Sequence, residues 1–220
     1  IIDQNEFYSP TLNKELDQKL SSISKSIILP MGEVSLSRKI KSLLIIFRTN
    51  TNVEIWDQNR KRVFEKPKIE YVLRSLYSLI KSIKKLKSEN KDIEIKLKII
   101  DDNSNEENLK KLKNLLILSS LDFEIIGHIF NDHKNYIKEQ KSSETFANLS
   151  SLLKSFEIGK TEGKDLVFFV EDDYLHFESA IEEMIATYER IASQLNKDIF
   201  MCPSDYPYLY MNNEKTSLLL

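Results

Sequence analysis

Three adjacent carboxylates, Glu171, Asp172 and Asp173, directly follow a short apolar run at residues 166–170. Like charges this close repel one another, so a nearby cation would stabilise them. A hard divalent cation with oxygen ligands suits that role, because it shares its remaining positions with water and substrate phosphates and neutralises a leaving diphosphate. The alternative is an acidic N-terminus for a helix that begins at Phe177, which the helix macrodipole favours. The strand-end position favours a metal site, with Mn²⁺ or Mg²⁺ as the cofactor.

Two further polar clusters also follow apolar runs; one holds Arg48, Thr49 and Asn50, and the other holds Asp101 and Asp102. Asp and Asn are common in turns and at helix N-caps, which is the alternative interpretation. Both roles are compatible, since Ser104 or Asn105 can cap the next helix while Asp102 binds. The carboxylates of the second cluster could accept hydrogen bonds from a base or from ribose hydroxyls. The second cluster could therefore bind a nucleotide.

Arg74 interrupts an apolar helical stripe and has two open interpretations. It is either a surface arginine with a buried stem, or a partner for phosphate or for the Asp pair. The three histidines, His128, His133 and His176, do not share metal-ligand spacing, and we expect them on the surface or in loops. His176 lies three residues after Asp173, so it alone is close enough in sequence to join the site.

The hydrophobic pattern predicts five short strands, at residues 43–47, 93–100, 123–126, 166–170 and 199–202. Helical spacing predicts helices between them, at residues 67–83, 105–118, 146–156 and 177–195. Strands alternating with helices predict an α/β fold with a doubly wound, mostly parallel sheet. Ligands bind such sheets outside the carboxyl ends of the strands, which is where the three polar clusters fall. We also expect a helix near residues 12–23, ending before Pro30, and a small hairpin at 53–63.

Composition limits the functional classes. The chain has 220 residues, and its 32 basic and 34 acidic side chains nearly balance, which argues against a nucleic-acid partner. A single cysteine excludes an intrachain disulfide and a structural zinc cluster. No apolar run approaches the roughly 20 residues of a transmembrane helix. We expect a cytoplasmic protein, with peripheral membrane attachment left open, and two parts: a lead-in at 1–40 and a ligand-binding α/β domain at 41–220, truncated at its C-terminus.

The order of these segments resembles GT-A-fold glycosyltransferases of the large family 2 type. The resemblance rests on FRTN at 47–50, KPKIEYVLRSLYSL at 66–79, KIIDDNS at 98–104 and DLVFFVEDD at 165–173. It implies a Rossmann-like GT-A fold and a metal-dependent transferase for hexosyl or related groups, with a nucleotide-sugar donor and a glycan or lipid-linked acceptor. By the same resemblance Asp102 contacts the nucleoside, Asp173 is the main metal ligand, and residues 48–50 flank the base.

The chain departs from the family pattern in three places. Fifteen residues, 51–65, separate Asn50 from the Lys66-Pro67 pair where the family has almost none. Asn103 replaces the common glycine, and Glu171 takes the first acidic position of the metal motif.

The catalytic base of an inverting member lies downstream of the metal motif. Asp205 is one candidate, and a base beyond Leu220 is the other, so inversion against retention stays open. We expect Tyr174, His176 and Tyr206 on the acceptor side. We also expect the chain to bind donor but to transfer little sugar by itself.

Three other interpretations compete with the glycosyltransferase. A signalling receiver domain is one, because VFFVEDD resembles its first strand and acidic pocket, but that interpretation leaves residues 43–160 unexplained. A nucleotidyltransferase would place a glycine-rich loop after the first strand, and no glycine lies near Arg48. A non-catalytic nucleotide-sugar-binding module is the third.

Overall fold

The computed structural model describes residues 25–28, 32–52, 66–128, 133–137 and 143–203. The chain divides into two compact units, one formed by Lys39–Glu183 and the other by Ile1–Arg38 together with Met184–Leu220. The sequence analysis placed a boundary after residue 40 and none further along. All of the predicted nucleotide- and metal-binding residues belong to the Lys39–Glu183 unit.

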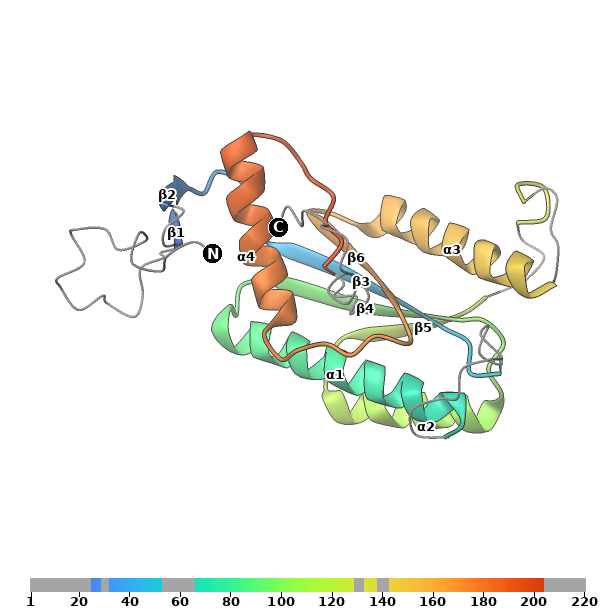
Figure 1. The fold of residues 1–220 in the computed structure, drawn as a ribbon. Coiled ribbons are helices and arrows are strands. Elements are labelled where there is room, and N and C mark those ends of the chain that lie inside the picture. Colours follow the sequence, from blue (N-terminus) through green and yellow to red (C-terminus); the bar gives the residue numbers. More distant parts are fainter. Residues whose placement is uncertain (1–24, 29–31, 53–65, 129–132, 138–142, 204–220) are drawn as a thin grey trace, which may run out of the picture. The chain divides into compact units, whose positions relative to one another are not determined.

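The Lys39–Glu183 unit is built on a four-stranded parallel sheet (Figure 1). In sheet order its strands are β5 (Phe123–Gly127), β4 (Glu94–Asp101), β3 (Ser42–Thr49) and β6 (Leu166–Glu171). The central strand β3 is buried on both faces from Leu43 to Phe47, as expected for a continuous apolar run. The predicted α/β class and these four strands are confirmed.

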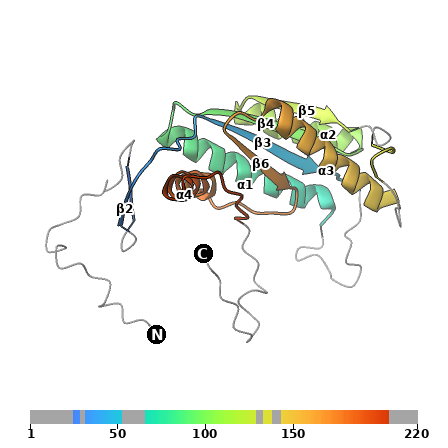
Figure 2. The ribbon, with the colours of Figure 1, turned by 90° about the horizontal axis from the view of Figure 1, so that it is seen from above.

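Helices cover both faces of this sheet. Figure 1 shows α1 (Lys68–Glu89) and α2 (Glu106–Ser119) on one side and α3 (Ser143–Glu162) on the other, and Figure 2 views the sheet from the α3 side. On the α3 side, Leu44 and Ile46 pack with Ile158 in one apolar cluster. The chain runs from β3 outward to β4 and β5 and then returns through α3 to β6, on the other side of β3. The strand order therefore reverses between β3 and β6.

Helix α2 begins as its sequence predicts. The Asn105 side chain caps it by accepting a hydrogen bond from the backbone N–H of Asn108 at 2.8 Å. Helix α3, in contrast, was expected over residues 146–156, but it extends from Ser143 to Glu162. Gly159 serves close packing instead, since a Cβ there would lie 2.9 Å from the Phe169 ring of β6.

The other unit contains the hairpin of β1 (Lys25–Ile28) and β2 (Gly32–Ser35) and most of α4 (Ala180–Leu195). The sequence analysis did not predict the hairpin. Gly32 has a φ of +81°, a conformation that suits glycine where the hairpin turns. Arg190 of α4 donates a hydrogen bond to the Gly32 carbonyl at 2.9 Å.

One predicted strand is wrong. Residues 199–202 pair with no strand among the described residues, and Phe200 is fully exposed. An apolar run predicts only that a segment can be buried. A strand also needs a neighbouring backbone, and none of the described strands supplies one here. The helix expected near 12–23 and the hairpin at 53–63 lie outside the described residues. None of the described helices is long and apolar enough to cross a membrane.

Candidate functional site

The candidate site lies at the carboxyl ends of β3, β4 and β6, where the strand order reverses. In open α/β sheets this switch point is the usual position of a ligand. The register pairs Arg48 with Glu171 across β3 and β6, and Thr49 with Asp101 across β3 and β4. Because side chains alternate along a strand, Arg48 and Glu171 lie on the α3 face and Thr49 and Asp101 on the opposite face.

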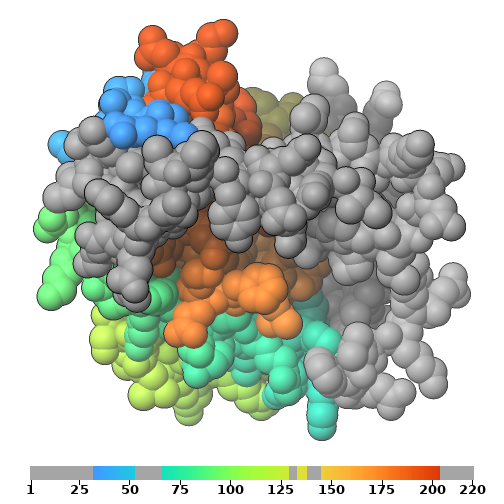
Figure 3. Space-filling model, turned by 60° about the vertical axis from the view of Figure 1, so that its left-hand side comes forward, coloured from blue at the N-terminus to red at the C-terminus, as the bar shows by residue number. Residues whose placement is uncertain are grey.

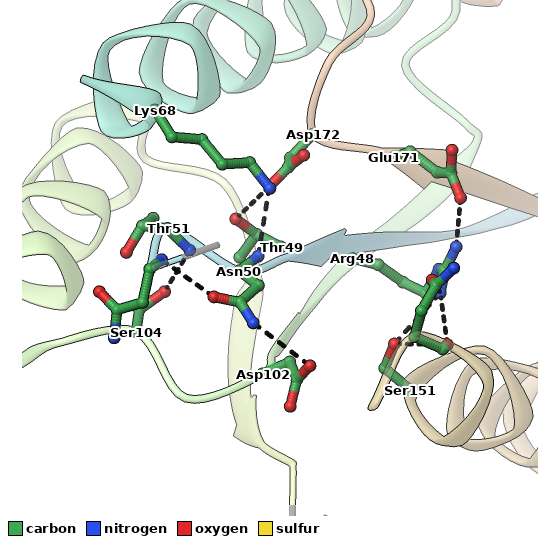
Figure 4. A network of polar contacts seen from close by, with 12 residues as sticks. Arg48, Thr49, Asn50, Thr51, Lys68, Asp102, Ser104, Ser151, Glu171 and Asp172 are labelled. Carbon is green, nitrogen blue, oxygen red and sulfur yellow. Dashed lines mark hydrogen bonds and ion pairs between the residues drawn. The ribbon is translucent and has the colours of Figure 1, made fainter. Parts of the chain in front are cut away.

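Asp172 is the centre of the polar network on the α1 side of the sheet (Figure 4). Its Oδ2 accepts hydrogen bonds from the Thr49 hydroxyl at 2.8 Å and from the backbone N–H of Asn50 at 3.2 Å. The Lys68 ammonium, from the first turn of α1, lies 3.3 Å from the same oxygen. Asp172 is only 8% exposed, so these contacts fix its carboxylate at the sheet edge.

Asn50 joins this network to the end of β4. Its side-chain amide donates to Asp102 Oδ2 at 3.4 Å. Beyond it, the two loops are tied together by the backbone N–H of Thr51, which donates to the Ser104 hydroxyl at 3.0 Å. The structure therefore brings Thr49 and Asn50 beside Asp101 and Asp102, as the sequence predicted.

Asp101 is a buried carboxyl with one unsatisfied oxygen. Its Oδ2 accepts the backbone N–H of Ser104 at 3.0 Å, whereas its buried Oδ1 has no hydrogen-bond partner in the part of the chain that is described. Burial raises the Asp101 pKa, and the charges of Asp102 and Asp172 raise it further. On this face, the carboxyl end of the sheet therefore carries an excess of negative charge.

Asp173 adds to that excess. Although its side chain keeps contact with solvent, surrounding protein atoms partly desolvate it and raise its pKa. The neighbouring charges of Asp172 and Glu171 raise the pKa further, and Lys68 opposes them only weakly. A carboxylate in this position gains stability from any added cation.

Glu171 and Arg48 form a separate network on the α3 face. The two side chains are ion-paired, and the Arg48 guanidinium also donates to the Ser151 hydroxyl and to Asn148 Oδ1, both at 3.1 Å (Figure 4). Arg48 is only 11% exposed, so its charge is neutralised where it is buried. Strand alternation therefore separates Glu171 from Asp172, although the two are adjacent in sequence.

The three predicted metal ligands are accordingly not gathered into one preformed set. Among the described residues, no group of three or more His, Cys, Asp or Glu side chains is arranged to hold a metal ion. Asp172 and Asp173 nevertheless offer hard oxygen donors in a region of excess negative charge, with the unsatisfied Asp101 oxygen nearby. That donor set fits a Mg²⁺- or Mn²⁺-like cation, which needs only one or two carboxylates when phosphates and water supply its other ligands.

Two of the three residues expected on the acceptor side, Tyr174 and His176, lie in the segment that follows β6. Figure 3 shows this segment, in orange, at the surface beside α1. His176 is half-buried, its Nδ1 lies 3.3 Å from the Ser78 hydroxyl of α1, and burial lowers its pKa. Tyr174 is also half-buried, and Arg74 is exposed on α1. Asp205 and Tyr206 lie outside the described residues.

Two features escaped the sequence analysis. Lys68 contacts Asp172, and a signal was present, because a lysine in the first turn of a helix opposes the macrodipole. The second feature is a histidine cluster after β5. His128 and His133 lie outside the helices and strands, as the expectation of surface or loop positions allows, but His133 is buried and not on the surface. His133 is 3% exposed, and the Ser150 hydroxyl lies 2.9 Å from both His133 Nδ1 and His128 Nε2. No sequence spacing indicated this cluster, because it joins a loop to α3.

No protein-family model matches this chain, and a search of curated proteins found no match either. The functional assignment therefore depends on the geometry of the site.

Proposed function

We propose that this protein is a metal-dependent glycosyltransferase of the GT-A type, which binds a nucleotide-diphosphate sugar at the carboxyl edge of its sheet. The acceptor is a glycan or a lipid-linked glycan. The observation that carries the proposal is the convergence of Thr49-Asn50, Asp101-Asp102 and Asp172-Asp173 at the switch point, with negative charge left uncompensated. A sugar-nucleotide site needs donors and acceptors for a nucleoside and carboxylates for a cation, and these clusters supply both.

The site suggests a division of roles among its residues. Asp102, bridged to Asn50, accepts hydrogen bonds from the nucleoside, and Asn50 fixes the orientation of that carboxylate. Asp172 and Asp173 hold the cation, and Thr49 keeps Asp172 in position. When bound, a divalent cation supplies neutralisation of the charge on the leaving diphosphate. We assign Arg48 and Glu171 to the scaffold, because they satisfy each other on the opposite face.

The fold bears on the receiver interpretation, whereas only an assay can distinguish the non-catalytic module. The receiver interpretation makes the strand that ends in Glu171 the first of its sheet, whereas β6 is the last of the four parallel strands in chain order. A non-catalytic nucleotide-sugar-binding module would use the same site without a base. Sugar transfer distinguishes it from the enzyme.

The direct test is a panel of sugar nucleotides, measured by thermal stabilisation with and without Mn²⁺. A ligand at about 100 times its Kd stabilises the folded state by about 2.7 kcal/mol. We expect one donor to stabilise the protein only when Mn²⁺ is present. Asp102→Asn should weaken the response to the nucleotide, and Asp173→Asn should remove the dependence on Mn²⁺.

Asp122→Asn is a matched control, because Asp122 is an exposed aspartate at the amino end of β5, away from the site. It should respond like the wild type. If no sugar nucleotide stabilises the wild type with Mn²⁺, or if Asp173→Asn keeps the full metal-dependent response, the proposed site is wrong.

A further inference from the structure

Lys68 occupies a position that ordinary helix chemistry disfavours. It is the first residue of α1, and its side chain is only 23% exposed. The N-terminus of a helix carries partial positive charge and attracts anions, so a cation there is locally unfavourable. Asp172 offsets this cost through the 3.3 Å contact with the Lys68 ammonium. Residues that break a local rule and depend on a distant partner often lie at functional sites.

Asp172 is itself shared among several groups. Its Oδ2 already accepts from Thr49 and from the backbone of Asn50, so its position does not depend on Lys68. Lys68 instead supplies positive charge to a region that lacks it. Asp101 has an unsatisfied buried oxygen. Besides burial, the charge of Asp172 raises the pKa of both Asp101 and Asp173.

We propose that Lys68 is an internal counter-ion, which neutralises Asp172 before ligand binds and moves to a phosphate of the ligand when a divalent cation replaces it. This inference rests on the proposed metal and diphosphate site. The exchange keeps a positive charge beside Asp172 at each stage. Lys68 and the N-terminus of α1 then face the diphosphate together, while the cation takes the carboxylate that Lys68 has left.

Two opposite effects follow from this exchange. A ligand binds more weakly when its site is occupied by a competitor for part of the time. Removing the Lys68 charge should therefore tighten binding of Mn²⁺ alone, and should weaken binding of pyrophosphate once Mn²⁺ is bound. We expect each change to be about tenfold, which is about 1.4 kcal/mol in binding free energy. A purely structural lysine would not change the two affinities in opposite directions.

The experiment uses the full chain with Lys68→Gln, Lys68→Arg and Lys81→Gln. Mn²⁺ binding is measured from the loss of the EPR signal of the free ion, and pyrophosphate binding by calorimetry at saturating Mn²⁺. Lys68→Gln should bind Mn²⁺ about tenfold more tightly and pyrophosphate about tenfold more weakly. Lys68→Arg keeps the charge and should resemble the wild type, so it reports on folding as well. Lys81, on the same helix and ion-paired with Glu178 at 3.7 Å, is the matched control and should show no change.

The outcomes separate this inference from the proposal on which it rests. If the wild type and Lys68→Gln bind Mn²⁺ equally tightly, Lys68 is not a counter-ion, although the metal site stands. If Lys68→Gln binds pyrophosphate as well as the wild type does, the transfer to phosphate is wrong. If the wild type binds no Mn²⁺ at all, the metal site itself fails, and this inference fails with it.

Discussion

On the α3 face of the sheet, Arg48 and Glu171 neutralise each other, and Ser151 and Asn148 accept further hydrogen bonds from the guanidinium. On the opposite face, burial raises the pKa of Asp101 and of Asp173, the charge of Asp172 raises both further, and Lys68 is a partial counter-ion. Both networks use residues that end the same strands. The first is complete without any ligand, whereas the second gains from an added cation. Charge balance therefore distinguishes scaffold from candidate site, although neighbouring residues in the sequence contribute to both.

The largest effect on stability should come from a substitution in the charge-balanced network of Arg48 and Glu171 on the α3 face. Arg48→Met leaves Glu171 unpaired and removes the bonds to Ser151 and Asn148. Loss of one partner of a buried pair costs roughly 3–5 kcal/mol, and we expect about 2 kcal/mol because Glu171 is half exposed. Urea denaturation measures this loss. Mn²⁺ affinity should not change, and the double variant with Glu171→Gln should recover part of the stability. Lost Mn²⁺ binding in a stable Arg48→Met protein would place Arg48 in the site.

Thr49→Val, on the opposite face of the sheet, should have a smaller effect on stability. Valine preserves the buried shape but removes the 2.8 Å hydrogen bond to Asp172. We expect a loss of about 1.5 kcal/mol in the free energy of unfolding, at the low end of the range for a hydrogen bond to a charged group. Weaker Mn²⁺ binding should accompany this loss, since Asp172 is then held less firmly. Thr161→Val, at an exposed position of α3, is the control and should change neither quantity. An unchanged Mn²⁺ affinity in Thr49→Val would show that Thr49 does not position Asp172 for metal.

Asp173→Asn should raise the melting temperature of the metal-free protein. The Asp173 pKa lies above its ordinary value of 3.8, so the folded state disfavours the charged form. The wild type therefore loses stability relative to the variant as the pH rises through the pKa of the folded state, and the difference is absent at pH values well below 3.8. Melting curves recorded without metal across this pH range measure the effect. A lower melting temperature for the variant at neutral pH would mean that this face is already charge-balanced.

The smallest effect on stability should come from His176→Gln, in the segment that follows β6. Burial lowers the His176 pKa below its ordinary value of 6.5, so the unfolded chain takes up a proton before the folded protein does. The wild type should therefore lose stability relative to the variant as the pH falls below 6.5, whereas above that value the difference between them should be constant. Paired melting curves at acidic and alkaline pH test this expectation. A difference that does not depend on pH would place His176 in contact with solvent.

The sequence by itself determined the α/β class and which segments end in polar residues. The runs at 43–47, 93–100, 123–126 and 166–170 were apolar enough to require burial, and each became a parallel strand. Turn and cap residues fixed where α2 begins, because Asn105 acts locally on the helix that follows it. Local rules also placed Asp101 and Asp102 at a strand end. These features depend on neighbours in the chain, so a single sequence is sufficient to predict them.

Tertiary structure decided how those polar residues are divided. Three adjacent carboxylates predicted one metal set, but strand alternation and the pairing of β6 with β3 placed Glu171 on the opposite face, beside Arg48. Lys68 and Asp172 are more than 100 residues apart in sequence, and their contact depends on how α1 packs against the strand ends. Burial of His133 likewise depends on its contact with α3, and residues 199–202 pair with none of the described strands. Sequence pattern alone could not predict the long-range pairing of these elements or the charge balance that results from it.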